Sequence, residues 1–211
     1  RLPLQEIMDA CRGNDRWLIV DGAHAVGAVD VDIPKLDVDC YAANGHKWMM
    51  APKGTGFMYL RRDVQERFWT TLASYQWDNY KDGAFRFMQF GTGSVPVVDG
   101  LMSALRFIEK IGMSRIEQWD AGLTKRLRDG LANIPAVRIA SPANPHLTAA
   151  ITTFRVNGVK AKALQDALWT KRVRVRAQSD ERGVRLSAHM YVSPADVDVV
   201  LDVTREIASR A

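Results

Sequence analysis

The sequence predicts an α/β fold in which a mainly parallel sheet with helices is followed by a small α+β domain. Residues 17–20 form a short apolar run that ends at Asp21, and such a run without polar alternation is typical of a strand buried on both faces. A second run of this kind, residues 38–42, ends just before Asn44. From residue 135 onward, short strand-like segments alternate with helical ones, and that mixture indicates a separate α+β domain.

The first half of the chain holds the predicted elements of the parallel sheet. Residues 4–11 have apolar side chains at helical spacing, and the turn-forming residues 13–15 end that helix. Residues 33–36 form a connector before the second strand. Residues 56–60 are a third predicted strand, and turn chemistry at residues 52–54 indicates a hairpin with the strand before it.

Residues 61–93 are the least regular part of the chain and concentrate aromatic side chains. An irregular aromatic segment suits an active-site wall or a contact between subunits. A loop packed onto its own core is an equally good interpretation of these residues.

The second half contains helices and short strands. A helix that begins near Val97 ends at Gly112, and a capping box of Ser114 and Glu117 is expected to begin the next helix. Ser193 is expected to cap the last helix. The remaining predicted elements are a helix around residues 164–168 and strands at residues 137–140, 149–156, 173–176 and 184–187.

These elements predict three parts, namely a larger domain over residues 1–95, connecting helices over residues 96–134 and a small domain over residues 135–211. The chain starts at Arg1 without an initiator methionine or a leader segment. We therefore expect it to be the C-terminal portion of a longer protein.

Composition narrows the classes of partner. The chain is 47% hydrophobic and 25% charged, as in ordinary globular proteins. No apolar stretch approaches the roughly 20 residues that cross a bilayer, so we expect no membrane partner. The net charge of +5 is modest and accompanies no nucleic-acid motif, so we expect no nucleic-acid partner. The two cysteines, Cys11 and Cys40, do not indicate a disulfide framework, and we expect a cytoplasmic location.

Asp21 and Lys47 define a candidate reaction centre. Asp21 ends the first strand and Lys47 closely follows the second, and ligands bind at the carboxyl ends of parallel strands. An acid and an amine are therefore expected at one edge of the sheet, although a turn aspartate and a surface lysine are the alternatives for each residue alone. Asp21 and His24, with His46 and Cys40 nearby, have metal-ligand chemistry. Their spacing fits no standard zinc pattern, so we expect no metal.

The segments DGAH at residues 21–24, NGHKW at residues 44–48 and APKGTG at residues 51–56 resemble the class V aminotransferase family. The resemblance covers essentially the whole chain. Within the family, the DGAH and NGHKW segments are most similar to those of isopenicillin N epimerase-like proteins. It implies the fold-type I architecture, with the C-terminal part of the large domain that binds pyridoxal 5′-phosphate (PLP) followed by the small C-terminal domain. The N-terminal half of the large domain has no counterpart here.

The resemblance implies a role for each residue of this motif. PLP needs a lysine that condenses with its aldehyde and a carboxylate that keeps its pyridine nitrogen protonated. Lys47 and Asp21 match these positions. His24 would contact the phenolic oxygen of the ring, with a core or turn histidine as the alternative. Asn44 and His46 match the residues of the family that bind the phosphate.

Two further residues are implied by the same resemblance. Gly91 and Thr92 match a pair that reaches the phosphate of the neighbouring subunit, and this implies a homodimer with shared sites. The alternative is a simple turn before a helix, where backbone N–H groups also suit a phosphate.

The substrate is expected to be a small-molecule amino acid, bound by arginine. Arg185 resembles the arginine that grips the substrate α-carboxylate, a task suited to a planar guanidinium that forms two parallel hydrogen bonds. Arg176 is expected to assist from the preceding strand. Solvated edge-strand arginines are the alternative, and that is the expectation for Arg172 and Arg174.

One departure from the family pattern bears on the reaction. Cysteine desulfurases of this family carry a nucleophilic cysteine in the loop that corresponds to residues 177–182, and this chain has none there. We therefore expect a PLP-dependent enzyme that forms a carbanion at the substrate Cα, epimerase-like first, with a carbon–sulfur β-lyase or a transaminase as alternatives. A non-catalytic binding or assembly fragment is the alternative of another class.

Overall fold

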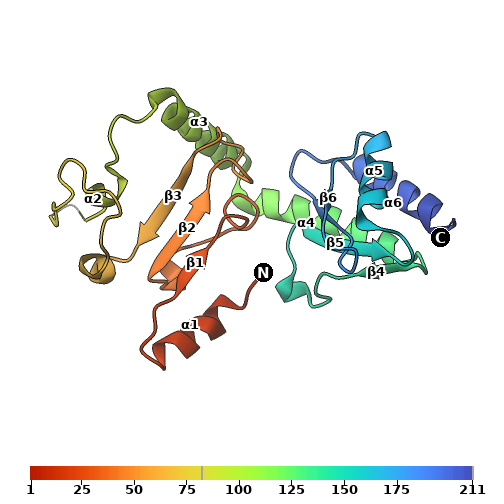
Figure 1. Ribbon diagram of the computed structural model, residues 1–211, viewed down its shortest axis with the longest axis horizontal. Coiled ribbons are helices and arrows are strands. Elements are labelled where there is room, and N and C mark those ends of the chain that lie inside the picture. Colours follow the sequence, from red (N-terminus) through yellow and green to blue (C-terminus); the bar gives the residue numbers. More distant parts are fainter. Residues whose placement is uncertain (82, 211) are drawn as a thin grey trace. The chain divides into compact units, whose positions relative to one another are not determined.

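The computed structural model describes residues 1–81 and 83–210, which form two compact units (Figure 1). The first unit comprises residues 3–112, and the second comprises residues 1–2 with the chain from Met113 onward. The division therefore falls between the two long helices. The three-part organisation with boundaries at residues 95 and 134 stays a prediction.

The first unit is a three-stranded sheet with helices. Strand β1 (Ile19–Asp21) pairs in parallel with β2 (Cys40–Asn44), which pairs antiparallel with β3 (Gly56–Leu60). The predicted third strand and its hairpin are thus confirmed, whereas the second strand lies two residues later than residues 38–42. The other elements are α1 (Leu4–Arg12), η1 (Pro34–Leu36), η2 (Arg62–Arg67), α2 (Phe85–Met88) and α3 (Val95–Ile111).

One face of this sheet is covered and the other is open. Met8 of α1 packs with Val20 and Tyr41 in the core of the unit. Strand alternation places Ile19 and Met58 on the opposite face, where they are 60% and 49% exposed. The face that carries Asp21 is therefore accessible in this chain.

The start of β2 is fixed by a buried carboxylate. The side chain of Asp39 is 0% exposed and accepts the backbone N–H of Leu18 at 2.7 Å. Arg12 of α1 and Arg61, which follows β3, both form ion pairs with it, at 3.1 Å and 3.0 Å. One acid thus links the helix, the entry to β1 and the end of β3.

The aromatic segment between η2 and α3 is partly packed and partly exposed. Arg86 is buried, and its guanidinium donates to the carbonyls of Gln65 at 2.6 Å and Phe68 at 2.9 Å. Phe68 in turn stacks on Trp17 with 4.9 Å between ring centroids. Four aromatic side chains of the segment are exposed, namely Trp69, Tyr75, Tyr80 and Phe90.

The second unit is an antiparallel sheet covered by helices on its apolar face. The strand order is β4-β5-β7-β6, and buried side chains of α4, α5 and α6 pack with those of the sheet in one core. This confirms an α+β arrangement. The elements are α4 (Met113–Ala132), β4 (Val137–Ile139), η3 (Pro145–Leu147), β5 (Ile151–Val156), α5 (Ala161–Thr170), β6 (Arg176–Ala177), β7 (Val184–Ser187) and α6 (Pro194–Ala208).

The capping box expected at Ser114 and Glu117 is wrong. Gly112 has φ 91° and separates α3 from α4, so α4 already begins at Met113 and Ser114 lies inside its first turn. There the Ser114 hydroxyl accepts from the side chain of Gln118 at 3.3 Å, and Glu117 forms an ion pair with Arg1. The cap at the last helix is confirmed, because Ser193 and Asp196 form a capping box.

In the part of the chain that the structure describes, no helix combines the length and the apolar character that a membrane span requires.

Replacing Asp39 tests whether its ion pairs stabilise the first unit. We expect Asp39→Asn to lower the free energy of unfolding by about 1–3 kcal/mol, because the buried position loses its charged hydrogen-bond acceptor. Arg12 and Arg61 keep their exposed aspartate partners. Urea unfolding followed by near-UV circular dichroism measures the change. The exposed Asp99→Asn on α3 is the matched control, with an expected change within about 0.5 kcal/mol. Equal effects of the two substitutions would contradict the assignment.

Candidate active site

Parallel pairing places Asp21 and the segment that carries Lys47 at one edge of the first sheet. Asp21 is the register partner of Ala42, and the next backbone N–H, that of Gly22, donates to the Ala42 carbonyl at 2.7 Å. β2 ends at Asn44, and Lys47 follows in the turn after it. Each strand therefore has a candidate functional residue at its carboxyl end or in the turn that follows.

The connections after β1 and β2 pack directly against each other. A Cβ at Gly27 would lie 2.6 Å from the carbonyl carbon of Trp48, and Gly27 has φ 92°. Such a close approach and such a φ are both suited to glycine. The DGAH and NGHKW segments are thus neighbours in space as well as in the motif.

The turn at Asp21 rests on Tyr41. A Cβ at Gly22 would lie 2.2 Å from the Tyr41 hydroxyl oxygen, and Tyr41 is 1% exposed. Burial, and then the nearby Asp21 charge, raise the pKa of the Tyr41 hydroxyl above its ordinary value. Oδ1 of Asp21 accepts the Ala23 backbone N–H at 2.9 Å. The carboxylate is therefore held in place on the open face.

His24 is oriented by Trp48. The indole Nε1–H of the buried Trp48 donates to Nδ1 of His24 at 3.1 Å. When Nδ1 accepts, the neutral imidazole carries its proton on Nε2, and this nitrogen is then the donor of the ring. His24 itself is exposed. Tyr41 and Trp48 were both missed as supporting residues, although Trp48 stands within the NGHKW motif.

The turn that holds Asn44, His46 and Lys47 is closed by backbone hydrogen bonds. Gly45 donates to the Thr55 carbonyl at 2.9 Å, and the Gly45 carbonyl accepts from Ala51 at 3.0 Å. Nδ1 of the exposed His46 lies 3.3 Å from the Thr55 carbonyl oxygen. Asn44 and Lys47 are half-buried. These contacts fix the backbone from which the lysine projects.

Gly91 and Thr92 lie apart from this edge in the chain, before the start of α3. Both are exposed, and Gly91 has φ 119°. Further along α3, a Cβ at Gly100 would lie 2.4 Å from Pro52, so the helix packs on the turn after β2. Gly91 and Thr92 therefore belong to the same unit as Lys47, and both are exposed to solvent.

The side chains at this edge fit PLP. An exposed carboxylate at the end of β1, an amine in the turn after β2 and an oriented imidazole supply the groups that the cofactor needs. The small side chain of Ala42, exposed beside Asp21, leaves room for a flat ring on that face. Lys47 would hold the cofactor, and Asp21 would lie at its pyridine nitrogen.

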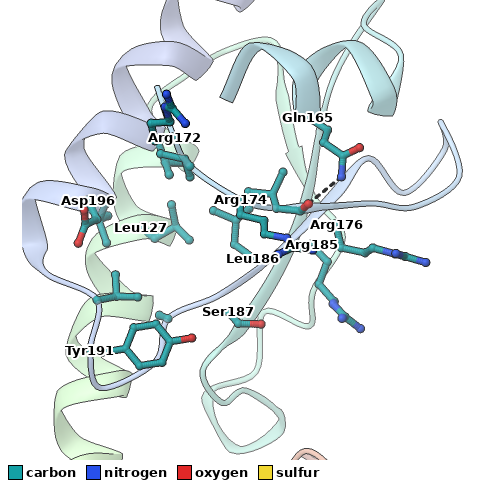
Figure 2. A pocket seen from close by; sticks show the side chains of 16 residues that line it. Leu127, Gln165, Arg172, Arg174, Arg176, Arg185, Leu186, Ser187, Tyr191 and Asp196 are labelled. Carbon is teal, nitrogen blue, oxygen red and sulfur yellow. Dashed lines mark hydrogen bonds between the residues drawn. The ribbon is translucent and has the colours of Figure 1, made fainter. Parts of the chain in front are cut away.

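The two predicted substrate arginines lie in the second unit. Arg176 of β6 and Arg185 of β7 are direct register partners, so their side chains share one face (Figure 2). They line a cavity of about 590 Å³, together with Arg172 and Arg174. Arg172 and Arg174 are exposed, as expected, but they belong to the same cavity as the predicted pair. Arg172 lies in a turn with φ 61°, so strand alternation does not align it with Arg176.

Within residues 1–81 and 83–210, the structure has no group of three or more histidine, cysteine, aspartate or glutamate side chains that could hold a metal ion.

The fold and the site define an α/β chain of the kind that holds an organic cofactor at a parallel sheet edge. The family model for class V aminotransferases matches residues 1–200, and the chain belongs to this family. The chain is 28% identical over 220 residues to isopenicillin N epimerase from Streptomyces clavuligerus, covering 95% of this chain and 55% of that protein. The chain thus spans about half the length of this relative.

Solved structures agree with the fold. The apo structure of a cysteine desulfurase from Thermococcus onnurineus NA1 has a TM-score of 0.84 at 28% identity, and covers 99% of this chain and 56% of that one. The cystine C–S lyase C-DES, solved with its product cysteine persulfide, has a TM-score of 0.87 at 26% identity, over 97% of this chain and 57% of that one. Another C-DES structure has glycine covalently linked to PLP.

These comparisons confirm the predicted class V family, the fold-type I architecture and PLP as the cofactor of the family. They also agree with the expectation that this chain corresponds to part of the full-length relatives. The relatives include both an epimerase and a C–S lyase, so they define a family of enzymes and leave the reaction to be proposed.

The contact between Gly22 and Tyr41 gives a test of how the Asp21 turn is supported. We expect Gly22→Ala to lower the free energy of unfolding by about 1–3 kcal/mol, because the added methyl group overpacks against the Tyr41 ring. Urea unfolding measures this change. The control is Gly13→Ala at the end of α1, where the nearest atom lies at 3.4 Å and φ is −62°. A Gly22→Ala variant as stable as the parent would refute the packing argument.

Proposed function

We propose that the protein is a PLP-dependent enzyme that forms a carbanion at the Cα atom of an amino acid and acts as an epimerase. The parallel pairing of β1 and β2, with Asp21 at its carboxyl edge and Lys47 in the adjoining turn, is the observation that carries this proposal. Membership of the class V family supports it. When bound, PLP supplies an electron sink that stabilises negative charge at Cα.

The first unit supplies the groups that hold the cofactor and move the proton. Lys47 Nζ would hold the cofactor and, when its amine is free, would take the proton from Cα and return it. Asp21 holds the proton on the pyridine nitrogen. His24 donates Nε2–H to the phenolic oxygen, and Asn44 and His46 bind the phosphate.

The second unit supplies the arginines that bind the substrate. Arg185 binds the α-carboxylate through two hydrogen bonds, and its register partner Arg176 assists. Fixing the carboxylate orients the Cα–H bond. Gly91 and Thr92 reach the phosphate of a second subunit, so the active protein is a homodimer. We place the protein in the cytoplasm.

Epimerisation ranks first among the reactions for two reasons. The chain is similar to an isopenicillin N epimerase over 95% of its length, and residues 177–182 contain no cysteine for a persulfide route. A carbon–sulfur β-lyase is the second candidate, because the fold of the C–S lyase C-DES matches at a TM-score of 0.87. A transaminase is third on family membership alone.

A non-catalytic binding or assembly module is the candidate of another class. The chain spans about half of its relatives' length, and this partial coverage is the observation that favours such a module. Covalent labelling by PLP separates this candidate from the enzyme.

Borohydride reduction in the presence of PLP is expected to label Lys47. Reduction traps the bond between the lysine amine and the cofactor aldehyde, and peptide mapping by mass spectrometry locates the label. Lys53, an exposed lysine in the same connection between β2 and β3, is the matched control. We expect Lys47→Arg to abolish the label and Lys53→Arg to retain it. Labelling that spreads equally over both lysines, or its absence when a control enzyme is labelled, would favour the non-catalytic module.

Arg185→Lys tests whether Arg185 binds the α-carboxylate of the substrate. We expect KM for α-proton exchange of amino acids in heavy water to rise about 10-fold or more, because an ammonium group cannot form the two parallel hydrogen bonds of a guanidinium. Proton NMR of the Cα–H signal measures the exchange. Arg115→Lys, at an exposed position on α4, is expected to leave KM unchanged. The same KM in the Arg185 variant and the parent would remove Arg185 from the site.

A further inference from the structure

One face of the sheet in the second unit packs on helices, and the opposite face carries arginine side chains. Phe154 and Val184 belong to the core beneath the helices, and strand alternation directs their neighbours in the chain to the opposite, open face. Figure 2 shows Arg176 and Arg185 pointing away from Leu127, which lies in that core. All charged residues of strands β4 to β7 lie on the open face, and three of the four are exposed. They are Arg138, Arg155, Arg176 and Arg185.

Strand register sets these arginines directly opposite each other in two pairs. Arg138 of β4 is the partner of Arg155 of β5, here called the β4–β5 pair. Arg176 of β6 is the partner of Arg185 of β7, here called the β6–β7 pair. Side chains at such positions have Cβ atoms roughly 5 Å apart, and like charges there are destabilising. The sheet thus holds two unfavourable contacts that an anion at each pair would relieve.

The guanidinium groups of both pairs have no acidic partner in the described part of the chain. None of the ion pairs among residues 1–81 and 83–210 involves them. Nη1 of Arg138 donates to the carbonyls of Pro135 at 3.3 Å and Val137 at 3.1 Å, and these bonds hold its side chain along the strand. Strands β4 to β7 contain no aspartate or glutamate. The strands that carry the positive charge therefore do not neutralise it.

The two pairs lie in neighbouring rows of the open face. Arg185 is the register partner of Thr153 on β5, and Arg155 follows Thr153 by two residues. With strands about 4.8 Å apart and a rise of about 3.4 Å per residue, the centres of the two pairs are roughly 12 Å apart. An extended peptide advances roughly 13 Å in four residues and then presents a side chain on the same side. Two acidic residues at that spacing fit the two pairs.

The open face favours a protein partner over a nucleic acid. Sheets that bind single-stranded nucleic acid present aromatic side chains on which the bases stack. Strands β4 to β7 place no aromatic side chain on the open face, where their other residues are Ile151, Thr153 and Ser187. A second copy of this chain is disfavoured, because its net charge of +5 is repelled by the same arginines. Carboxylates of an acidic protein segment match both the charge and the spacing.

We propose that an extended acidic segment of a partner protein docks on the open face, with one carboxylate at the β4–β5 pair and a second at the β6–β7 pair. Each carboxylate accepts charge-assisted hydrogen bonds from two guanidinium groups and relieves their repulsion. The docking does not rest on the proposed function. Because Arg185 is also the residue proposed to bind the substrate α-carboxylate, the segment and an amino-acid substrate compete for it.

Two labelled peptides of the same composition test the spacing. Each has two glutamates among serine and threonine residues, four positions apart in the first peptide and five positions apart in the second. In an extended chain, the first arrangement places both carboxylates on one side, and the second places them on opposite sides. We expect fluorescence anisotropy to give the first peptide an affinity about 10-fold higher, because it alone reaches both arginine pairs with hydrogen bonds between charged groups.

Substitution of Arg155 tests the β4–β5 pair. We expect Arg155→Gln to abolish the preference for the first peptide, and Arg115→Gln, at an exposed position on α4, to retain it. Equal affinity for the two peptides, or no binding of either, would overturn the inference. Tighter binding of a single-stranded DNA of thymidines than of the first peptide would also overturn it, because phosphate would then be the preferred anion. Labelling of Lys47 by PLP is expected to be unchanged in Arg155→Gln, so absence of that label from the parent protein contradicts only the proposed function.

Discussion

The buried carboxylate of Asp39 is the interaction on which the first unit depends. It accepts from the Leu18 backbone and pairs with Arg12 and Arg61, so it joins α1, the entry to β1 and the end of β3 at the start of β2. A buried charge is tolerated only when its partners are complete, and this requirement defines one arrangement of these segments. These contacts lie beside the first register pair of β1 and β2, Ile19 with Cys40, and this register places Asp21 and the Lys47 turn at one edge.

At that edge, glycines allow contacts that other residues would prevent. Gly22 leaves room for the Tyr41 ring, and Gly27 lets the segment after β1 touch the backbone at Trp48. Trp48 then orients His24 through its indole N–H. The turn at Asp21 and the ring of His24 thus each rest on a buried aromatic residue, and such support gives an exposed candidate site rigidity.

Local patterns predicted most of the elements, and the site motif predicted which residues meet. Helix α1, strand β3 and the cap at Ser193 follow from short-range rules of spacing and capping. The capping box at Ser114 failed because Gly112 ended α3 and α4 began at the next residue, so a tertiary boundary overrode a local signal. Tyr41 was not predictable as a support for the turn at Asp21, because its contact with Gly22 depends on strand pairing. The shared cavity of Arg172 and Arg176 depends on α6 and β7, which lie later in the chain.

The two units use charge in opposite ways. In the first unit, the buried carboxylate of Asp39 pairs with Arg12 and Arg61, and these ion pairs stabilise the unit. In the second, Arg176 and Arg185 face each other without an ion pair, although an acid at either position would have stabilised the strands. Natural sequences break such local rules mainly at functional sites. Asp196 lines the same cavity yet is held by Ser193, so the positive charge is left available for a ligand. Two guanidinium groups that face each other in this way would suit a carboxylate, as in the role proposed for Arg185 and Arg176.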